Sequence, residues 1–198
     1  MTSPSLTKAD KARIAKLATT AQALQDGTET YFSITRLTSL KSLCQNPETA
    51  HRFVFYLARC TQAKIMTTPK PDYTGEAEWA IYQNLIAEAV QAMEAYLENP
   101  APDSVLALKK IHSQARNLQN QHRQQGWNTL RIIHSKEVLT IEYALEGILS
   151  PQIAPDYAYR AGRNYVERYD SRYGTGLIPA SAPLLMEIVQ FWHSYYNL

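Results

Sequence analysis

Apolar side chains recur every three or four residues along most of the chain, which is the spacing of an amphipathic helix. A first helix is predicted from Thr7, a favoured N-cap residue, to about Gln25, with Gly27 just beyond its end. Its apolar face consists of Ile14, Leu17, Ala21 and Leu24.

Two further helices are predicted in the next forty residues. Apolar residues at intervals of three between Ile34 and Leu43 indicate the first of them, in a stretch crowded with Thr and Ser. The other is predicted to open at Asn46-Pro47-Glu48, with Asn as the cap, Pro at the first position and an acid in the first turn.

The central part of the chain predicts a long helical hairpin. Its first helix extends from about Gly75 to Asn99, and alanines widen its apolar face, so we expect it to lie at the centre of the protein. Pro100-Ala101-Pro102 turns the chain, and Asp103 or Ser104 is expected to cap the next helix, which ends before Gly126.

Three helices are predicted in the last third of the chain. The first covers about Thr129 to Leu149, the second begins with Asp156 as N-cap and ends near Tyr173, and the third ends near Asn197. Loops are expected near residues 67–74, 99–103, 150–155 and 174–183, and residues 1–6 are expected to be flexible. The chain is therefore predicted to be all-α, a single domain over residues 1–198 formed by an irregular bundle of about seven or eight helices.

Composition supports a soluble globular protein. Hydrophobic residues make up 45% of the chain and charged residues 19%, and the net charge of +2 implies no obligate nucleic-acid or membrane partner. The N-terminus lacks the apolar core of a signal peptide, and no apolar run reaches the roughly 20 residues of a membrane span. We expect a cytoplasmic protein in which Cys44 and Cys60 are buried, reduced thiols.

Charge is segregated along the hairpin. Residues 71–103 contain seven acids and no Lys or Arg, whereas residues 104–136 contain six Lys or Arg, three His and no acid. This pattern predicts an antiparallel hairpin with complementary edges, or else a basic surface directed at a partner. The candidates for a basic face that binds phosphates or an acidic protein lie at spacings of three, four and seven: Lys109, His112, Arg116 and Arg123.

The segment 156–173 combines five Tyr with four Arg. Helical geometry places Ala158, Gly162 and Tyr165 on one stripe, which is typical of helix packing. The residues that lie off this stripe are candidates for contact with a protein partner or with nucleic acid: Tyr157, Tyr159, Arg160 and Arg163.

The C-terminal part supplies a second group of candidates. Leu177 and Ile178 lie in an uncharged loop, and Trp192 and Tyr196 lie on the aromatic face of the last helix. A face of this kind belongs either to the core or to an interface with a partner.

Catalytic and metal-binding motifs are missing from the sequence. Glu48 and His51 have the ExxH spacing of di-iron bundles, but those sites need two such pairs and two more glutamates. We therefore expect no catalytic residue, no metal site and no cofactor.

These features lead to one functional expectation and two alternatives. The leading one is a non-catalytic helical module for protein–protein interaction that acts as an assembly, adaptor or regulatory factor and can self-associate. The first alternative is a nucleic-acid-binding regulator that uses the basic face and the Tyr/Arg helix. The second is an enzyme or small-ligand binder with an aromatic pocket between helices.

Overall fold

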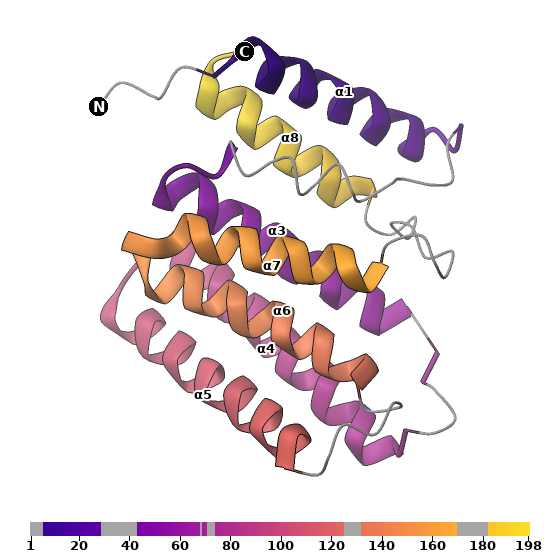
Figure 1. Ribbon diagram of the computed structural model, residues 1–198, viewed down its shortest axis with the longest axis vertical. Coiled ribbons are helices and arrows are strands. Elements are labelled where there is room, and N and C mark those ends of the chain that lie inside the picture. The colour runs from indigo at the N-terminus through magenta and orange to yellow at the C-terminus, as the bar shows by residue number, and fades with distance from the viewer. Residues whose placement is uncertain (1–5, 29–42, 68, 71–73, 125–131, 170–181) are drawn as a thin grey trace.

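The computed structural model describes residues 6–28, 43–67, 69–70, 74–124, 132–169 and 182–198 (Figure 1). Over these residues all regular structure is helical, which confirms the predicted all-α class. The predicted helix over residues 34–43, the start of the helix at Thr129 and the loop with Leu177 and Ile178 lie outside the described residues. The elements are α1 (Lys8–Gln25), α3 (Pro47–Thr67), α4 (Glu76–Glu98), α5 (Pro102–Gln124), α6 (Ile132–Leu149), the 3₁₀ turn η2 (Pro151–Ile153), α7 (Ala154–Tyr169) and α8 (Ala182–Tyr196).

Capping residues define the first two of these helices as the sequence predicts. Thr7 Oγ1 accepts a hydrogen bond from the Asp10 backbone N–H at 3.1 Å, and Gly27 follows the end of α1 with φ +70°. Asn46 Oδ1 likewise accepts from the Thr49 backbone N–H at 3.1 Å at the start of α3. Side-chain oxygens thus satisfy backbone donors that have no partner within the helix.

Two predicted helix starts are wrong. Helix α5 begins at Pro102, before Asp103, and the Ser104 hydroxyl donates to the Ala101 carbonyl at 2.7 Å. Helix α7 begins at Ala154, directly after η2, so Asp156 lies in its first turn instead of capping it. Proline has a helical φ and no N–H to satisfy, so Pro102 and Pro155 fit into first turns that the predictions placed in loops.

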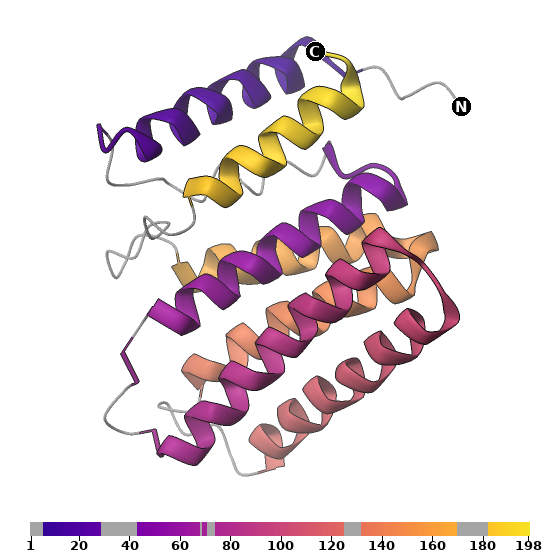
Figure 2. The ribbon, with the colours of Figure 1, turned by 180° about the vertical axis from the view of Figure 1, so that it is seen from behind.

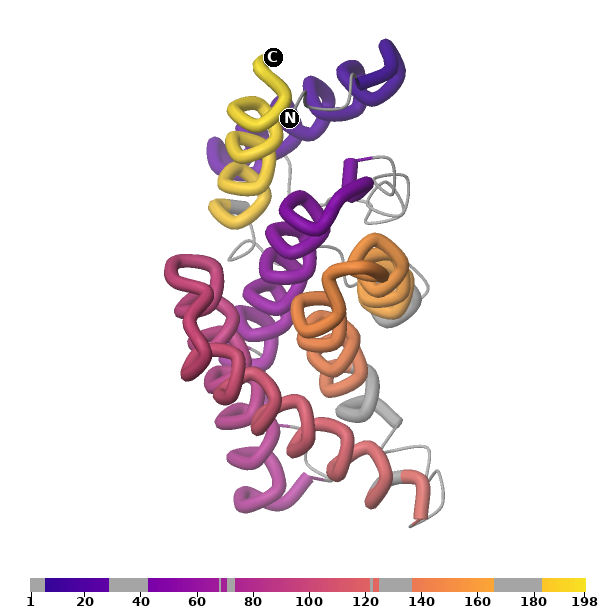
Figure 3. Tube along the Cα trace, turned by 90° about the vertical axis from the view of Figure 1, so that its left-hand side faces the viewer, coloured from indigo at the N-terminus to yellow at the C-terminus, as the bar shows by residue number. Residues whose placement is uncertain are grey.

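Each described helix packs either against α3 or against a helix that contacts α3. Helices α1 and α8 lie together at one end, and α8 also packs on α3 (Figures 1 and 3). Helix α3 in turn contacts α4, α6 and α7, while α5 packs against α4 and α6. In Figure 2 α3 lies in front of α7 and α4 in front of α6, so these four helices form two layers.

Helix α4 is therefore not the central helix that was predicted, since α3 contacts α4, α6, α7 and α8, and α6 contacts α3, α4, α5 and α7. Side chains around most of the α3 circumference are buried, from Ala50 through Val54 and Leu57 to Thr61. On α4 several of the alanines that widened the apolar face are exposed. Alanine favours helices by its intrinsic propensity and does not need burial, so an Ala-rich face was a poor guide to the centre.

Phe53 joins three helices at the middle of α3. Its ring stacks on Trp192 of α8, with the centroids 6.2 Å apart. On another side, a Cβ atom added to Gly162 of α7 would lie 3.3 Å from Phe53 Cε1. The absence of a side chain at Gly162 lets α7 approach the ring closely, so Phe53 fixes the positions of both α7 and α8 relative to α3.

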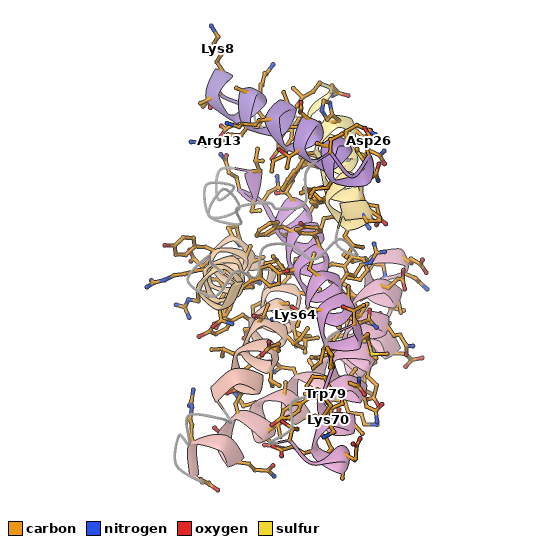
Figure 4. All side chains as sticks on the ribbon, turned by 90° about the vertical axis from the view of Figure 1, so that its right-hand side faces the viewer. Lys8, Arg13, Asp26, Lys64, Lys70 and Trp79 are labelled. Carbon is orange, nitrogen blue, oxygen red and sulfur yellow. The ribbon has the colours of Figure 1, made fainter. Side chains whose placement is uncertain are left out.

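Polar groups are also buried between α3, α6 and α7. Lys64, labelled in Figure 4, places its Nζ 3.8 Å from Glu137 Oε1 of α6. Burial, followed by the neighbouring Cys60, raises the pKa of Tyr165 well above its usual range, and Tyr165 hydrogen-bonds with the Cys60 thiol. Cys44 and Cys60 are both buried thiols outside any disulfide, as predicted, and burial raises the pKa of the Cys44 thiol.

In the part of the chain that the structure describes, no helix combines the length and the apolar character needed to cross a membrane.

We expect Phe53→Ala to lower the free energy of unfolding by about 3–5 kcal/mol, because it leaves a cavity between α3, α7 and α8. Urea unfolding followed by circular dichroism measures this change. The matched control is Leu106→Ala on α5, whose side chain is 67% exposed and whose loss should cost within about 0.5 kcal/mol. Equal effects of the two substitutions would contradict the central role of Phe53.

His51 should make stability depend on pH. Its buried ring meets Tyr96 of α4 edge-on, with centroids 6.2 Å apart. Burial lowers the pKa of His51, and its hydrogen bond to the Gly147 backbone opposes that shift. The unfolded chain then binds this proton more readily than the folded one, so the stabilisation is complete above about pH 6.5 and declines as the pH falls below it.

The corresponding experiment compares wild type with His51→Phe by urea unfolding at pH 7.5 and pH 5.5. Wild type should lose more stability between these values than the variant, by up to about 1.4 kcal/mol for each pH unit below 6.5. Equal losses in both proteins would show that His51 does not titrate differently on folding.

Candidate functional site

Helix α7 has a small-residue inner face and a charged outer face. Ala154, Ala158 and Ala161 are fully buried, so their small side chains allow α7 to lie close to α3 and α6. Arg160 and Arg163 are exposed on the opposite side, as the helical geometry predicts. Tyr159 is also exposed, and Tyr157 is half-buried, at the edge that faces α6.

An open groove with a volume of about 350 Å³ runs between α6 and α7. Two guanidinium groups, one phenol and one carboxamide line it together with a leucine, and the lining contains no acid among the described residues. The lining residues are Leu139, Tyr143, Arg160, Arg163 and Asn164.

Arg160 is held by an aromatic ring instead of an ion pair. Its Cζ lies 5.1 Å from the centroid of the Tyr157 ring, and that ring is in turn 6.2 Å from the ring of Tyr143 on α6. Among the described residues Arg160 has no acidic partner within ion-pair distance. An arginine stacked in this way keeps its N–H edge available for a carboxylate or phosphate.

Two close contacts between α6 and α7 fix the shape of the groove. The Asn164 side-chain amide donates to Thr140 Oγ1 at 2.7 Å, and both residues are buried. A Cβ atom added to Gly147 would lie 3.2 Å from the Tyr157 Cβ, so a side chain at Gly147 would push Tyr157 away. The groove therefore has rigid walls, which reduces the entropy cost of binding a partner.

The basic face of α5 is directed partly at α6 and not at solvent alone. His112 Nε2 lies 2.8 Å from Glu146 Oε2, a contact whose angle falls short of a well-directed hydrogen bond. Arg116 Nε lies 3.6 Å from Glu142 Oε1. Lys109 and Arg123 are exposed. The acids that lie next to this row therefore belong to α6, whereas the sequence pattern predicted that they would belong to α4.

Two of the C-terminal candidates, Trp192 and Tyr196, are built into the fold. Trp192 is completely buried against Phe53, so its side chain is not offered to a partner, and the core alternative describes it correctly. The hydroxyl of the half-buried Tyr196 donates to the Leu43 carbonyl at 3.0 Å, and burial raises the pKa of Tyr196 to about 12. Leu177 and Ile178 lie outside the described residues.

Sequence reasoning missed the α6 wall of the groove. Leu139 and Tyr143 are four residues apart and share one face of α6, yet no charge or repeat marked that face. The signal that the sequence does contain is the position of Tyr143 between Glu142 and Glu146, which is typical of an amphipathic helix. An exposed stripe and a stripe that faces a neighbouring helix have the same period. Periodicity alone therefore could not show which of the two the face with Leu139 and Tyr143 is.

Comparison of the chain with protein-family models, with curated proteins and with solved structures found no significant match in any of the three.

Over the described residues, no three His, Cys, Asp or Glu side chains gather closely enough to hold a metal ion.

We expect Gly147→Val to destabilise the protein by about 1–3 kcal/mol, because the new side chain forces Tyr157 and α7 away from α6. Gly75→Ser is the control, since Gly75 is the N-cap of α4 and has open space around it. Thermal unfolding of the two variants gives the comparison. A Gly147→Val protein as stable as wild type would mean that the α6–α7 contact is looser than described.

Proposed function

We propose that the protein is a non-catalytic interaction module that binds an acidic segment of a partner protein on the outer face of α7 and in the α6–α7 groove. The observation that carries this proposal is the guanidinium of Arg160, which is stacked on Tyr157 without an acidic partner beside a groove whose described lining holds no acid. Arginine and tyrosine are the residues most enriched where proteins recognise one another.

The chemistry of the lining supports recognition. An arginine side chain presents planar N–H donors that match a carboxylate, and Arg160 places such a guanidinium at the groove. Tyr143 adds an amphipathic surface with few rotatable bonds, which binds a partner at low entropy cost. These groups bind and orient an anion, whereas proton transfer at neutral pH calls for side chains that titrate there.

A protein partner is favoured over nucleic acid by the pairing of the α5 row. His112 and Arg116 meet acids of α6, so half of the predicted basic face is already offset by negative charge. A nucleic acid has a long row of phosphates and is bound by many cations at once. Two arginines on α7 fit a short acidic segment better.

Charge reversal of both arginines tests the proposal. Arg160→Glu/Arg163→Glu should reduce recovery of specific proteins from a nuclease-treated extract of the native host by about tenfold or more, because each lost charge-assisted contact contributes about 1.5–3 kcal/mol. Quantitative mass spectrometry of affinity-purified samples measures the recovery. The control is Lys11→Glu/Lys16→Glu, which changes the net charge equally at exposed positions of α1.

Two outcomes would reject the proposed function. If both charge-reversed proteins recover the same proteins as wild type, the α7 face does not bind them. If the difference appears only in extracts that were not treated with nuclease, the partner is nucleic acid, and the proposal for a protein partner is wrong.

A further inference from the structure

A second groove lies where α3 meets α8, apart from the α6–α7 groove. Its volume is about 100 Å³. The two helices each contribute apolar side chains, and α3 also contributes two arginines. The lining residues that carry the argument are Arg52, Phe55 and Arg59 of α3 with Leu184, Ile188 and Phe191 of α8.

The floor of this groove is part of the core. Ile188 is 4% exposed, Leu184 8% and Phe55 9%, so these side chains are held in place by their packing. A cavity of roughly 150 Å³ lined by such residues holds a benzene molecule. The recess of about 100 Å³ is smaller than such a cavity and is open to solvent, so it can take up the end of one apolar side chain from another molecule.

The two arginines at the rim differ in their pairing. Arg59 Nη1 and Nη2 donate to the two carboxylate oxygens of Glu187 on α8, so this guanidinium is already engaged. Arg52 lies two helical turns earlier on the same side of α3, with its Cζ 5.8 Å from the centroid of the Phe191 ring. Among the described residues, Arg52 has no acidic partner within ion-pair distance.

Core packing alone does not require an exposed arginine beside an apolar recess. An exposed arginine held on an aromatic ring has its N–H edge directed away from the ring and able to reach an anion. Arg52 lines the same recess as the apolar side chains. The site thus offers one apolar pocket and one unpaired positive charge side by side.

We propose that the α3–α8 groove binds a segment of a partner protein that presents one large apolar side chain with a carboxylate close beside it. The apolar side chain enters the recess between Phe55 and Ile188, and the carboxylate pairs with Arg52. A single acid is specified because Arg59 is already bound to Glu187. This site uses none of the α7 residues and therefore stands or falls separately from the proposed function.

Selection from a library of displayed twelve-residue peptides on the full-length protein tests this inference. Enriched peptides should share an apolar residue with Asp or Glu one to three positions away. Fluorescence anisotropy with the best enriched peptide should then show affinity reduced by about tenfold or more in Arg52→Glu. The control is Lys11→Glu, a charge reversal at an exposed position of α1 outside both grooves, which should leave that affinity unchanged, and Arg160→Glu is measured beside it to detect binding in the α6–α7 groove.

Four results would overturn the inference. The first is that no peptide is enriched over empty support, and the second is that enriched peptides carry no acid or bind Arg52→Glu as tightly as wild type. The third is a dimer in sedimentation velocity that Arg52→Glu dissociates, because the groove would then be occupied by a second copy of this chain. Loss of binding in Arg160→Glu but not in Arg52→Glu would reject this site and leave the α7 proposal standing.

Discussion

The burial of α3 on most of its sides is the constraint on which the rest of the structure depends. Phe53, near the middle of this helix, stacks on Trp192 of α8 and closely approaches Gly162 of α7. A ring enclosed in this way cannot move without displacing a neighbouring helix, because protein interiors are packed as densely as organic crystals. The positions of α7 and α8 therefore both follow from α3.

Both grooves depend on this arrangement. The α6–α7 groove needs α7 at a fixed distance from α6, which the packing of α7 on α3 and the missing side chain at Gly147 allow. The α3–α8 groove has α3 itself as one wall. Arginines lie over aromatic rings in both grooves, Arg160 over Tyr157 in one, and Arg52 over Phe191 and Arg59 over Phe55 in the other. Rigid helices thus hold cationic groups in place before any partner arrives, which lowers the entropy cost of binding.

Much of the local structure could be predicted from sequence, because it depends on neighbours along the chain. Thr7 and Asn46 cap their helices as their residue types predict, and Gly27 has the positive φ that ends α1. The small residues of α7 and Tyr165 face inward, whereas Tyr159 and Arg160 face outward, since a single helix with one apolar stripe has only one stable orientation.

Which face of a helix packs against which neighbouring helix could not be predicted in the same way. The face of the last helix was correctly found to be aromatic, but Trp192 is in the core while its neighbour Phe191 lines a groove. Likewise the sequence predicted that the α5 row meets the acids of the preceding helix or else forms a basic surface, and its partners Glu142 and Glu146 are in a helix about thirty residues away in sequence. These pairings are set by tertiary packing, which periodicity within one helix does not encode.

The central claim is that α3 is the helix on which the other helices depend, whereas α1 packs mainly on α8 at one end. Hydrogen–deuterium exchange of the native protein, read by mass spectrometry as protection factors for each helix, tests it most directly. Amides of a central helix exchange only when the whole protein unfolds, and amides of a peripheral helix exchange through smaller openings. We predict that α3 is the most protected helix and that α1 exchanges well before it. Protection in α1 equal to that in α3, or greater, would contradict this account.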